Sequence, residues 1–378
     1  MRLYSALIWS IAVGFFGSTA CRTADDETVI EVLDAPEFIE LFRLGNELEG
    51  DSVLFGRVGE LLAVDGSGRI FIGDHQVPVI HVFNRDGVFQ TSIGQSGSAP
   101  GEFSRIQSIH VEHSDSLYVF DFGLNRISVF DTDQFEIQRS ISVSQDSLGL
   151  PFSLLGSTDT GFLMTYGWPI SPGDASEDRY IHVTHVGWAA EMIDLPIHSV
   201  QASEWLTSSE GEQIYAIRIP FGRKPVLRKG SSGNLYSGWT DSLSISIFSL
   251  DGILQHSINH SLKPVTLTRS ELELAVEGRS DWVRDAIINA DLADFKPVYD
   301  HFIVDDLEQI WLRTTPPSIA DSTVEWLVFN EKGHLSHRFH LPVSTNLLEI
   351  RDDRVYAVDS QYGDQVIVYQ LKKSELNV

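Results

Sequence analysis

Aspartates recur at one position of a repeated strand pattern, and they are the first side chains in this sequence that could carry chemistry. Asp74, Asp121 and Asp359 each end a short apolar strand, and Asp241 lies two residues past the corresponding strand end. Carboxylates gathered at strand ends can bind a cation. They can equally accept hydrogen bonds from the backbone of a neighbouring loop, which would make them structural. The sequence leaves both interpretations open.

Tryptophan and arginine stand near this position in the remaining repeats. Trp168 and Arg313 lie near the two strand ends that lack an acid, so no complete ring of carboxylates is predicted. Arg223 and Trp239 approach the same end in the fourth repeat, where they could hold a planar or anionic ligand. The alternative is a basic loop paired with surface acids. The predicted binding face comprises Asp74, Asp121, Arg126, Trp168, Arg223, Trp239, Asp241, Arg313 and Asp359.

The thirteen histidines do not form a pattern typical of a metal centre. His182 and His185 are three residues apart on a predicted strand, so they face opposite sides of it. His334, His337 and His340 crowd a predicted outer strand. The sequence shows no clustered zinc spacing, Gly-x-Ser-x-Gly elbow or phosphate-binding loop. It therefore predicts no metal and no cofactor, and it leaves the catalytic residues unassigned.

The strands that must position these residues come in six copies. An anchor strand recurs at residues 69–74, 116–121, 161–166, 234–239, 309–314 and 354–359. The starts are 47, 45, 73, 75 and 45 residues apart. Three of these spacings match one propeller blade of roughly 40–50 residues, and the other two contain an insertion. A second strand with period-2 alternation follows each anchor, and a turn then leads into a further strand.

Each repeat is thus predicted to be a four-stranded antiparallel meander, and six of them form an all-β, six-bladed β-propeller. The sixth blade runs out of chain after three strands, which would leave an exposed edge. Propellers close such an edge with a strand from the other terminus. Residues 38–44 are the expected donor, with residues 29–33 as the alternative. The propeller is predicted to span residues 37–372.

The second repeat resembles a known repeat family. The segment GQSGSAPGEF at residues 94–103 precedes LYVFD at 117–121 and NRI at 125–127, and together they look like an NHL repeat. The match is close over residues 60–142 and degenerate afterwards. The layout is similar to that of bacterial six-bladed propeller lipoproteins. This resemblance implies that a strand-end aspartate pairs with the arginine or backbone of the next link, as Asp121 would near Arg126.

Enzymes with the same architecture define the alternative hypothesis. Exported propellers include zinc-dependent lyases, and a calcium-dependent lactonase of this shape needs Glu, Asn and Asp around one calcium at the inner ends of its blades. The inner strands here offer Glu60, Asp305 and Glu349 but no matching pair of asparagines. If the lactonase model applies, calcium is the alternative cofactor. The corresponding function would be a metal-dependent hydrolase, lactonase or lyase that uses the central channel.

The longest connections are predicted to share one face of the propeller, at residues 94–104, 167–179, 196–223, 260–298 and 314–323. Loops gathered on one face usually mark the binding side, although neutral drift of tolerated insertions would give the same pattern. Within residues 260–298, Thr268 and Glu271 form a capping box ahead of an apolar stripe. We expect a helical insertion between blades four and five that packs on the propeller and caps one end of its channel.

Residues 1–20 have the pattern of a cleavable export signal. Their apolar run is about fourteen residues, shorter than the roughly 20 that span a bilayer. Cys21, the single cysteine, follows Ala20 and resembles the acylated cysteine of a lipobox, although Ser18 stands where leucine is usual. An ordinary secretory signal is the alternative. Residues 21–36 would then be a tether with a possible extra strand, and residues 373–378 a tail.

The charge balance limits the kinds of partner that the protein is expected to bind. The sequence has 27 basic and 53 acidic residues, a net charge of −26, which disfavours nucleic acid. We expect an exported monomer at the cell envelope, on the periplasmic or cell-surface side, that contacts the membrane only through an N-terminal lipid. Its predicted function is that of a non-enzymatic binding or scaffold module, which recognises a protein, peptide or glycan through the long-loop face.

Overall fold

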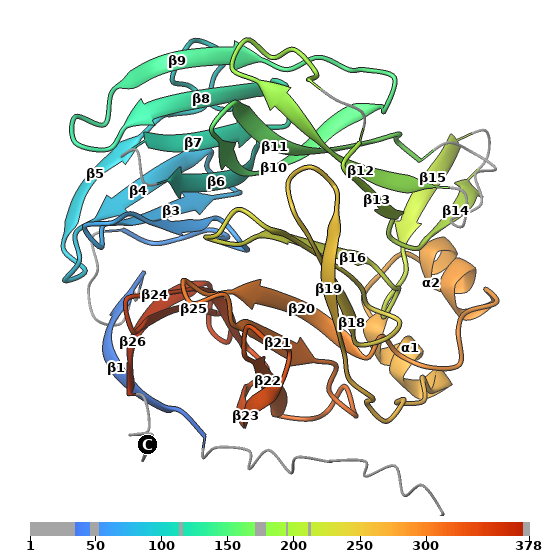
Figure 1. Cartoon of the computed structure of the whole chain (residues 1–378). Helices are drawn as coiled ribbons and strands as arrows, with labels where there is room; N and C mark the ends of the chain where they lie inside the picture. Colours follow the sequence, from blue (N-terminus) through green and yellow to red (C-terminus); the bar gives the residue numbers. More distant parts are fainter. Residues whose placement is uncertain are drawn as a thin grey trace, which may run out of the picture. The chain divides into compact units, whose positions relative to one another are not determined.

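Six four-stranded antiparallel sheets stand around a common centre in the computed structural model (Figure 1). The structure describes residues 35–45, 53–112, 116–170, 179–193, 196–210 and 213–372. The predicted signal, Cys21 and the alternative donor at residues 29–33 lie outside the described residues, as does the C-terminal tail. Within the described part, no helix has the length and apolarity needed to cross a membrane.

The blades follow one another along the chain. Blades one to three contain β2 (Leu62–Val64), β3 (Ile70–Asp74), β4 (Val79–Phe83) and β5 (Phe89–Ile93); β6 (Ile106–Glu112), β7 (Ser116–Asp121), β8 (Arg126–Asp131) and β9 (Ile137–Ser142); β10 (Leu150–Thr158), β11 (Gly161–Gly167), β12 (Tyr180–Gly187) and β13 (His198–Gln201). Blades four to six contain β16 (Pro225–Lys229), β17 (Leu235–Trp239), β18 (Ser244–Phe248) and β19 (Leu254–Asn259); β20 (Tyr299–Val304), β21 (Ile310–Thr314), β22 (Thr323–Phe329) and β23 (Leu335–Pro342); β24 (Thr345–Arg351), β25 (Arg354–Asp359), β26 (Gln365–Lys372) and β1 (Glu37–Leu44).

The anchor strands are buried on both faces, and this explains their sequence. All five residues of β3 are buried, whereas the outer strand β5 is largely exposed. Neighbouring blades bury the two faces of the anchor strand, so most of its residues are apolar and the polar ones stand mainly at its ends. A hydrophobic cluster joins each neighbouring pair of blades around the ring. The cluster between blades three and four has only four buried residues, Leu163, Val183, Leu227 and Leu235.

The N-terminal strand closes the last blade, as predicted. β1 pairs with β26 in antiparallel register from Glu37↔Lys372 to Leu44↔Val366. Phe38 packs against Phe339 and Tyr369 with ring centroids 5.2 and 5.8 Å apart. Residues more than 300 positions apart in the sequence thus form one sheet, and β1 covers an edge that β26 would otherwise leave unpaired.

The helical insertion contains two short helices, α1 (Arg269–Ala275) and α2 (Asp281–Ile288). Thr268 and Glu271 form the predicted capping box at the start of α1. The apolar stripe packs chiefly against a two-stranded hairpin, β14 (Trp205–Glu210) with β15 (Gln213–Arg218), which the sequence analysis did not anticipate. No described residue of either helix lines the central channel. The prediction that the helical insertion caps one end of the channel is therefore wrong.

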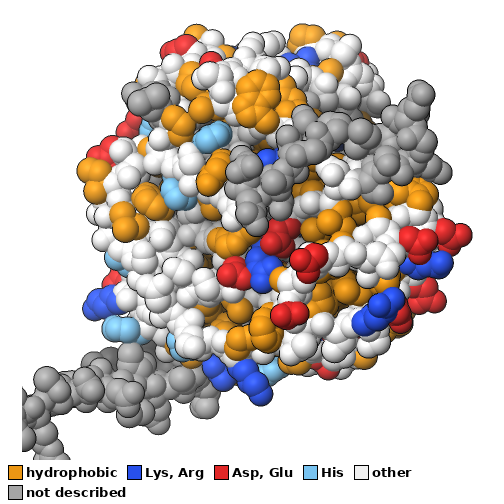
Figure 2. Space-filling view, turned by 90° about the vertical axis from the view of Figure 1, so that its right-hand side faces the viewer, with side chains coloured by type: hydrophobic (Ala, Val, Ile, Leu, Met, Phe, Trp, Pro, Cys, Tyr) orange, Lys and Arg blue, Asp and Glu red, His pale blue; other side chains and the backbone are white. Residues whose placement is uncertain are grey.

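The side of the molecule that carries α1 and α2 mixes apolar and charged side chains (Figure 2). Leu274 and Phe295 are exposed there by 55% and 47%. The ion pairs Arg269–Glu273 and Arg284–Asp281 lie on the helices themselves, and such exposed pairs add little stability.

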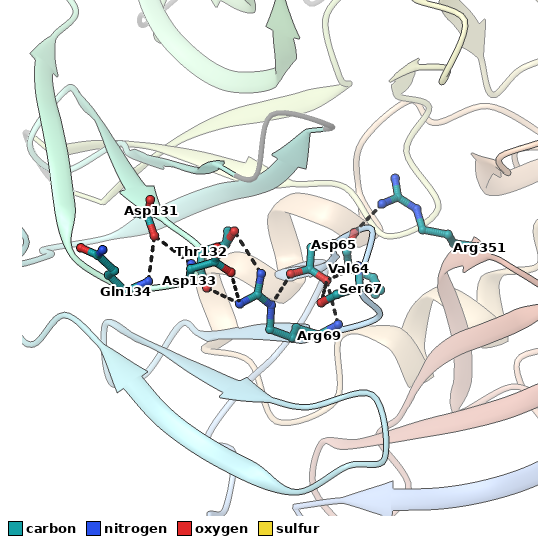
Figure 3. A network of polar contacts seen from close by, with 9 residues as sticks. All are labelled: Val64, Asp65, Ser67, Arg69, Asp131, Thr132, Asp133, Gln134 and Arg351. Atoms are coloured by element: carbon teal, nitrogen blue, oxygen red, sulfur yellow. Dashed lines mark hydrogen bonds and ion pairs between the residues drawn. The ribbon is translucent and has the colours of Figure 1, made fainter.

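Arginine side chains tie neighbouring blades together around the first blade (Figure 3). Arg69 donates to Asp65 within its own blade and reaches the carbonyl oxygen of Thr132 in blade two at 2.6 Å. Arg351 of blade six donates to the carbonyl oxygen of Val64 at 2.7 Å. These contacts fix the positions of turns at the inner end of blade one, next to the central cavity.

Candidate functional site: the central cavity

A cavity of about 820 Å³ occupies the centre of the ring. Its wall is formed by the innermost strands β2, β6, β10, β16, β20 and β24, which contact one another in that order and back to β2. On one face of the ring, the lining includes residues of the links that precede the first strands of the blades. On the other face, it includes the turns that connect the first strand of a blade to the second. The charged residues and histidines that line it are Arg57, Glu60, His75, His110, Glu112, Arg218, Arg228, Lys229, His301, Asp305, Asp306, Glu349, Arg351 and Asp364.

An ion pair crosses the cavity between opposite blades. Arg228 of blade four donates to Glu60 of blade one at 3.0 Å. His301 Nδ1 lies 3.8 Å from Glu60, and its Nε2 is 3.1 Å from the carbonyl oxygen of Leu347. The Arg228 guanidinium holds the pKa of Glu60 far below its ordinary value, with His301 assisting and burial opposing. Glu60 is therefore ionised although protein surrounds it, and 61% of its side chain stays exposed to the cavity.

A second pair lies near the first-to-second-strand turns. Lys229 Nζ is 3.2 Å from Glu112, which also accepts a hydrogen bond from the backbone N–H of Ser157 at 3.1 Å. Asp305 nearby accepts hydrogen bonds from Trp311 Nε1 at 2.9 Å and from the backbone of Gln309 at 2.7 Å. Burial raises the pKa of Asp305 to about 6, and these hydrogen bonds oppose the rise.

Glu349 is the acid in this wall that gains least from its partners. Its carboxylate is 3.5 Å from Arg351 Nε, and only 23% of its side chain is exposed. Burial raises the pKa of Glu349 to about 7, although Arg351 favours the charged form. Near neutral pH this carboxyl group therefore exchanges its proton easily.

Replacing Glu349 with glutamine should stabilise the protein in alkaline solution. The pKa of Glu349 rises from 4.5 to about 7 on folding, so its contribution is fully present below pH 4.5 and is lost as the pH rises through 7. Because part of the side chain meets solvent, we expect E349Q to gain about 1–2 kcal/mol at pH 8 and nothing at pH 4. Denaturant unfolding at the two pH values measures this. An equal gain at both would contradict the ionisation argument.

None of the nine residues of the predicted binding face lines the cavity. Asp74 and Asp121 are buried and accept hydrogen bonds from the backbone of the links that precede their own blades. Asp74 accepts from Gly56 at 2.6 Å, and Asp121 accepts from Ser104 at 2.6 Å and from Arg105 at 3.1 Å. In this arrangement both carboxylates are engaged with the loops they position.

Two more of the nine also hold loops or strands. Arg126 makes no ion pair with Asp121 and instead donates to three carbonyl oxygens of the loop at residues 94–104, including that of Ser98 at 2.9 Å. Asp359 lies 3.5 Å from Arg43 of β1. The sequence placed these residues at the correct end of the blade, but it could not show which carbonyl groups they reach.

The remaining members occupy the long-loop face outside the cavity. Arg223 pairs with Asp241 and with Glu204, and Arg313 pairs with Asp300 at 2.9 Å. Trp239 is half-buried, and Trp168 is 52% exposed. Both arginines are therefore already engaged with carboxylates, in agreement with the alternative of a basic loop paired with acids.

The cavity instead brings together residues that sequence reasoning mostly passed over. Glu60, Asp305 and Glu349 were noticed as inner-strand acids, but the basic side chains opposite them were not. The available signal was charge on otherwise apolar inner strands, as at Arg228 and Lys229. Within the described part of the chain, no group of three or more His, Cys, Asp or Glu residues could hold a metal ion.

Comparison with known proteins agrees with this architecture. A family model described as a 6-bladed β-propeller matches residues 21–151. Together with the six four-stranded sheets, this match defines the class: the protein is a six-bladed β-propeller. No curated protein matches the chain in sequence.

Several solved structures resemble the chain at low identity. One is a Bacteroides fragilis NCTC 9343 protein provisionally described as exported, with 14% identity and a TM-score of 0.51 over 89% of this chain and 95% of that one. A member of the DUF4221 family from Bacteroides vulgatus ATCC 8482 has 11% identity and a TM-score of 0.48 over 89% and 98%. Virginiamycin B lyase from Staphylococcus aureus has 10% identity and a TM-score of 0.42 over 82% and 94%. The likeness to the first of these structures concerns the fold and not the function.

Proposed function

We propose that this chain is a non-enzymatic binding propeller of the cell envelope, built from NHL-type repeats. It recognises a protein, peptide or glycan at its long-loop face, with the mouth of the central cavity as the centre of that site. The observation that carries the proposal is the cavity of about 820 Å³, whose lining includes link residues of that face such as His75, Arg218 and Ser360. Concave sites of this size commonly bind ligands.

The acids of the cavity favour binding over metal-assisted catalysis. Glu60 is paired with Arg228, Glu112 with Lys229, and Asp305 accepts from Trp311. A catalytic cation would have to displace these partners before it gained its carboxylate ligands, and breaking the largely buried pair of Lys229 and Glu112 is costly. The metal-dependent hydrolase or lyase therefore has less support from the geometry.

A bulky side chain placed in the cavity should weaken binding without unfolding the protein. Gln107 lines the cavity, is exposed and lies at an irregularity of β6 where the register shifts. We expect Q107W to weaken capture of ligands from peptide, protein and glycan arrays at least about tenfold, since about 1.4 kcal/mol is lost when contact with the wall is blocked. The matched control is Q90W, because Gln90 is exposed on the outer strand β5. Equal binding by both variants would refute a site in the cavity.

We further propose that the protein is exported and anchored through acylated Cys21, as a monomer. The support is the sequence pattern of residues 1–20 and the small residue that precedes the cysteine. In the native host, C21A should move from the membrane fraction to the soluble fraction. A C21A protein that still sediments with membranes would overturn the lipid anchor and leave the propeller's binding function unaffected.

A further inference from the structure

Two guanidinium groups of the central cavity have no partner among the residues that the structure describes. Arg57 lies in the link before β2, and Arg218 is the last residue of β15. Both side chains are exposed, and neither makes a hydrogen bond or an ion pair with any described residue. The other three basic residues of the lining are engaged: Arg228 with Glu60, Lys229 with Glu112, and Arg351 with Glu349 and Val64.

Every acid of the same lining has a partner. Besides the three acids in these ion pairs, Asp305 accepts from Trp311 Nε1, Asp306 from the backbone of Asp352 at 3.0 Å, and Asp364 from the backbone of Val58 at 2.8 Å. A cation that entered the cavity would have to compete with these bonds. An anion would instead find two guanidinium groups without a partner among the described residues, and the planar guanidinium fork matches the geometry of an oxyanion.

The two free arginines belong to opposite sides of the ring. Arg57 precedes the first strand of blade one, and Arg218 lies at the base of the hairpin that leads into the first strand of blade four. The inner strands follow one another as β2, β6, β10, β16, β20 and β24, so β2 and β16 are three positions apart in either direction. The two arginines thus approach the cavity from opposite blades. A ligand with two oxyanion groups can therefore engage one arginine from each side.

We propose that the cavity mouth binds a ligand that carries two separated oxyanion groups, one held by Arg57 and the other by Arg218. This inference rests on the proposed binding function and specifies the chemistry of its ligand. Carboxylates and phosphates share the geometry that a guanidinium fork recognises, so either could supply the oxyanions.

The test is isothermal titration of the full mature chain with four sets of probes at low ionic strength. The sets are α,ω-dicarboxylates of increasing length, monocarboxylates and diols of matched length, and a sugar bisphosphate. We expect one length of dicarboxylate to bind at least about tenfold more tightly than the monocarboxylate and the diol of matched length, or the bisphosphate to bind at least about tenfold more tightly than the diols. R57Q and R218Q should each remove that advantage. R279Q is the matched control, since Arg279 is exposed outside the cavity with no side-chain partner among the described residues.

The outcomes separate this inference from the proposed function. Tighter binding of the dicarboxylate identifies carboxylate ligands, and tighter binding of the bisphosphate identifies phosphate ligands. Doubly charged probes that bind no better than diols, or R57Q and R218Q variants that bind as the unmodified protein does, overturn the inference. If a neutral ligand then binds in a way that Q107W blocks, the cavity is still a binding site and only the anion chemistry is wrong. If charged probes bind equally well to Q107W, the cavity is not the site and both proposals fall.

Discussion

Replacing Leu44 with aspartate should release the strand that closes the propeller and lower the free energy of unfolding by about 4 kcal/mol or more. Leu44 is the last residue of β1, is only 5% exposed, and packs in the cluster between blades six and one with Phe55, Val366 and Val368. A carboxylate there would be buried without a partner. The strand it belongs to pairs with β26 from Val366 to Lys372, so its loss would expose an unpaired edge.

The same substitution three residues earlier provides the control. Leu41 lies on β1 but is 42% exposed, so L41D should change the free energy of unfolding by no more than about 0.5 kcal/mol. Guanidinium chloride denaturation of both variants measures the difference. If L44D were as stable as L41D, closure by β1 would not contribute to the stability of the ring. A further expected consequence of L44D is concentration-dependent association, because an exposed β26 is a template for another strand.

Closure of the sixth blade could be predicted because it follows from counting. The repeat pattern supplied three strands for that blade, and an open edge is unfavourable, so a strand from the N-terminus was required. The helix start was predictable for a local reason, since Thr268 and Glu271 satisfy the first turn of α1 themselves. Blade closure depends on the repeat and the helix start depends on a short-range pattern. Both kinds of pattern can be recognised in a single sequence.

The pairings across the ring could not be predicted in the same way. Arg228 and Glu60 are separated by 168 residues, and the local sequence around either residue does not indicate that the two form an ion pair. The hairpin of β14 and β15 was hidden in an insertion that looked like a loop, so the partner of the helical stripe was missed. Strand-end aspartates were found because they repeat. Arg57 and Arg218 were not found, because a side chain that has no partner among the described residues is recognised only when its surroundings are known.

Replacing Lys296 with methionine should destabilise the protein by about 3–5 kcal/mol, because it leaves a poorly exposed carboxylate without its cation. The Lys296 side chain is fully buried, its Nζ lies 2.5 Å from Glu271 Oε1, and it also donates to the carbonyl oxygen of Pro317 at 2.9 Å. Glu271 caps α1 and accepts from the backbone of Ile319, so one carboxylate joins the helical insertion to blade five.

The pH dependence of this variant should show the role of the charge. Although burial favours its neutral form, hydrogen bonds from Lys296 and Thr268 lower the pKa of Glu271 from 4.5 to about 2. The resulting stability is present above pH 4.5 and is lost as the pH falls towards 2. The difference between the unmodified protein and K296M should therefore shrink on acidification. A difference that stays constant with pH would indicate lost packing instead.

A double variant separates the ion pair from the packing around it. In K296M/E271Q no unpaired buried carboxylate remains, and glutamine can still complete the capping box with Thr268. We expect the double variant to recover about 1–3 kcal/mol of the stability that K296M loses at pH 7, since removing both partners of a buried pair costs less than removing one. Thermal or denaturant unfolding of the four proteins of this cycle gives the coupling. A double variant less stable than K296M would mean that Glu271 stabilises α1 independently of Lys296, through its bonds to Thr268 and Ile319.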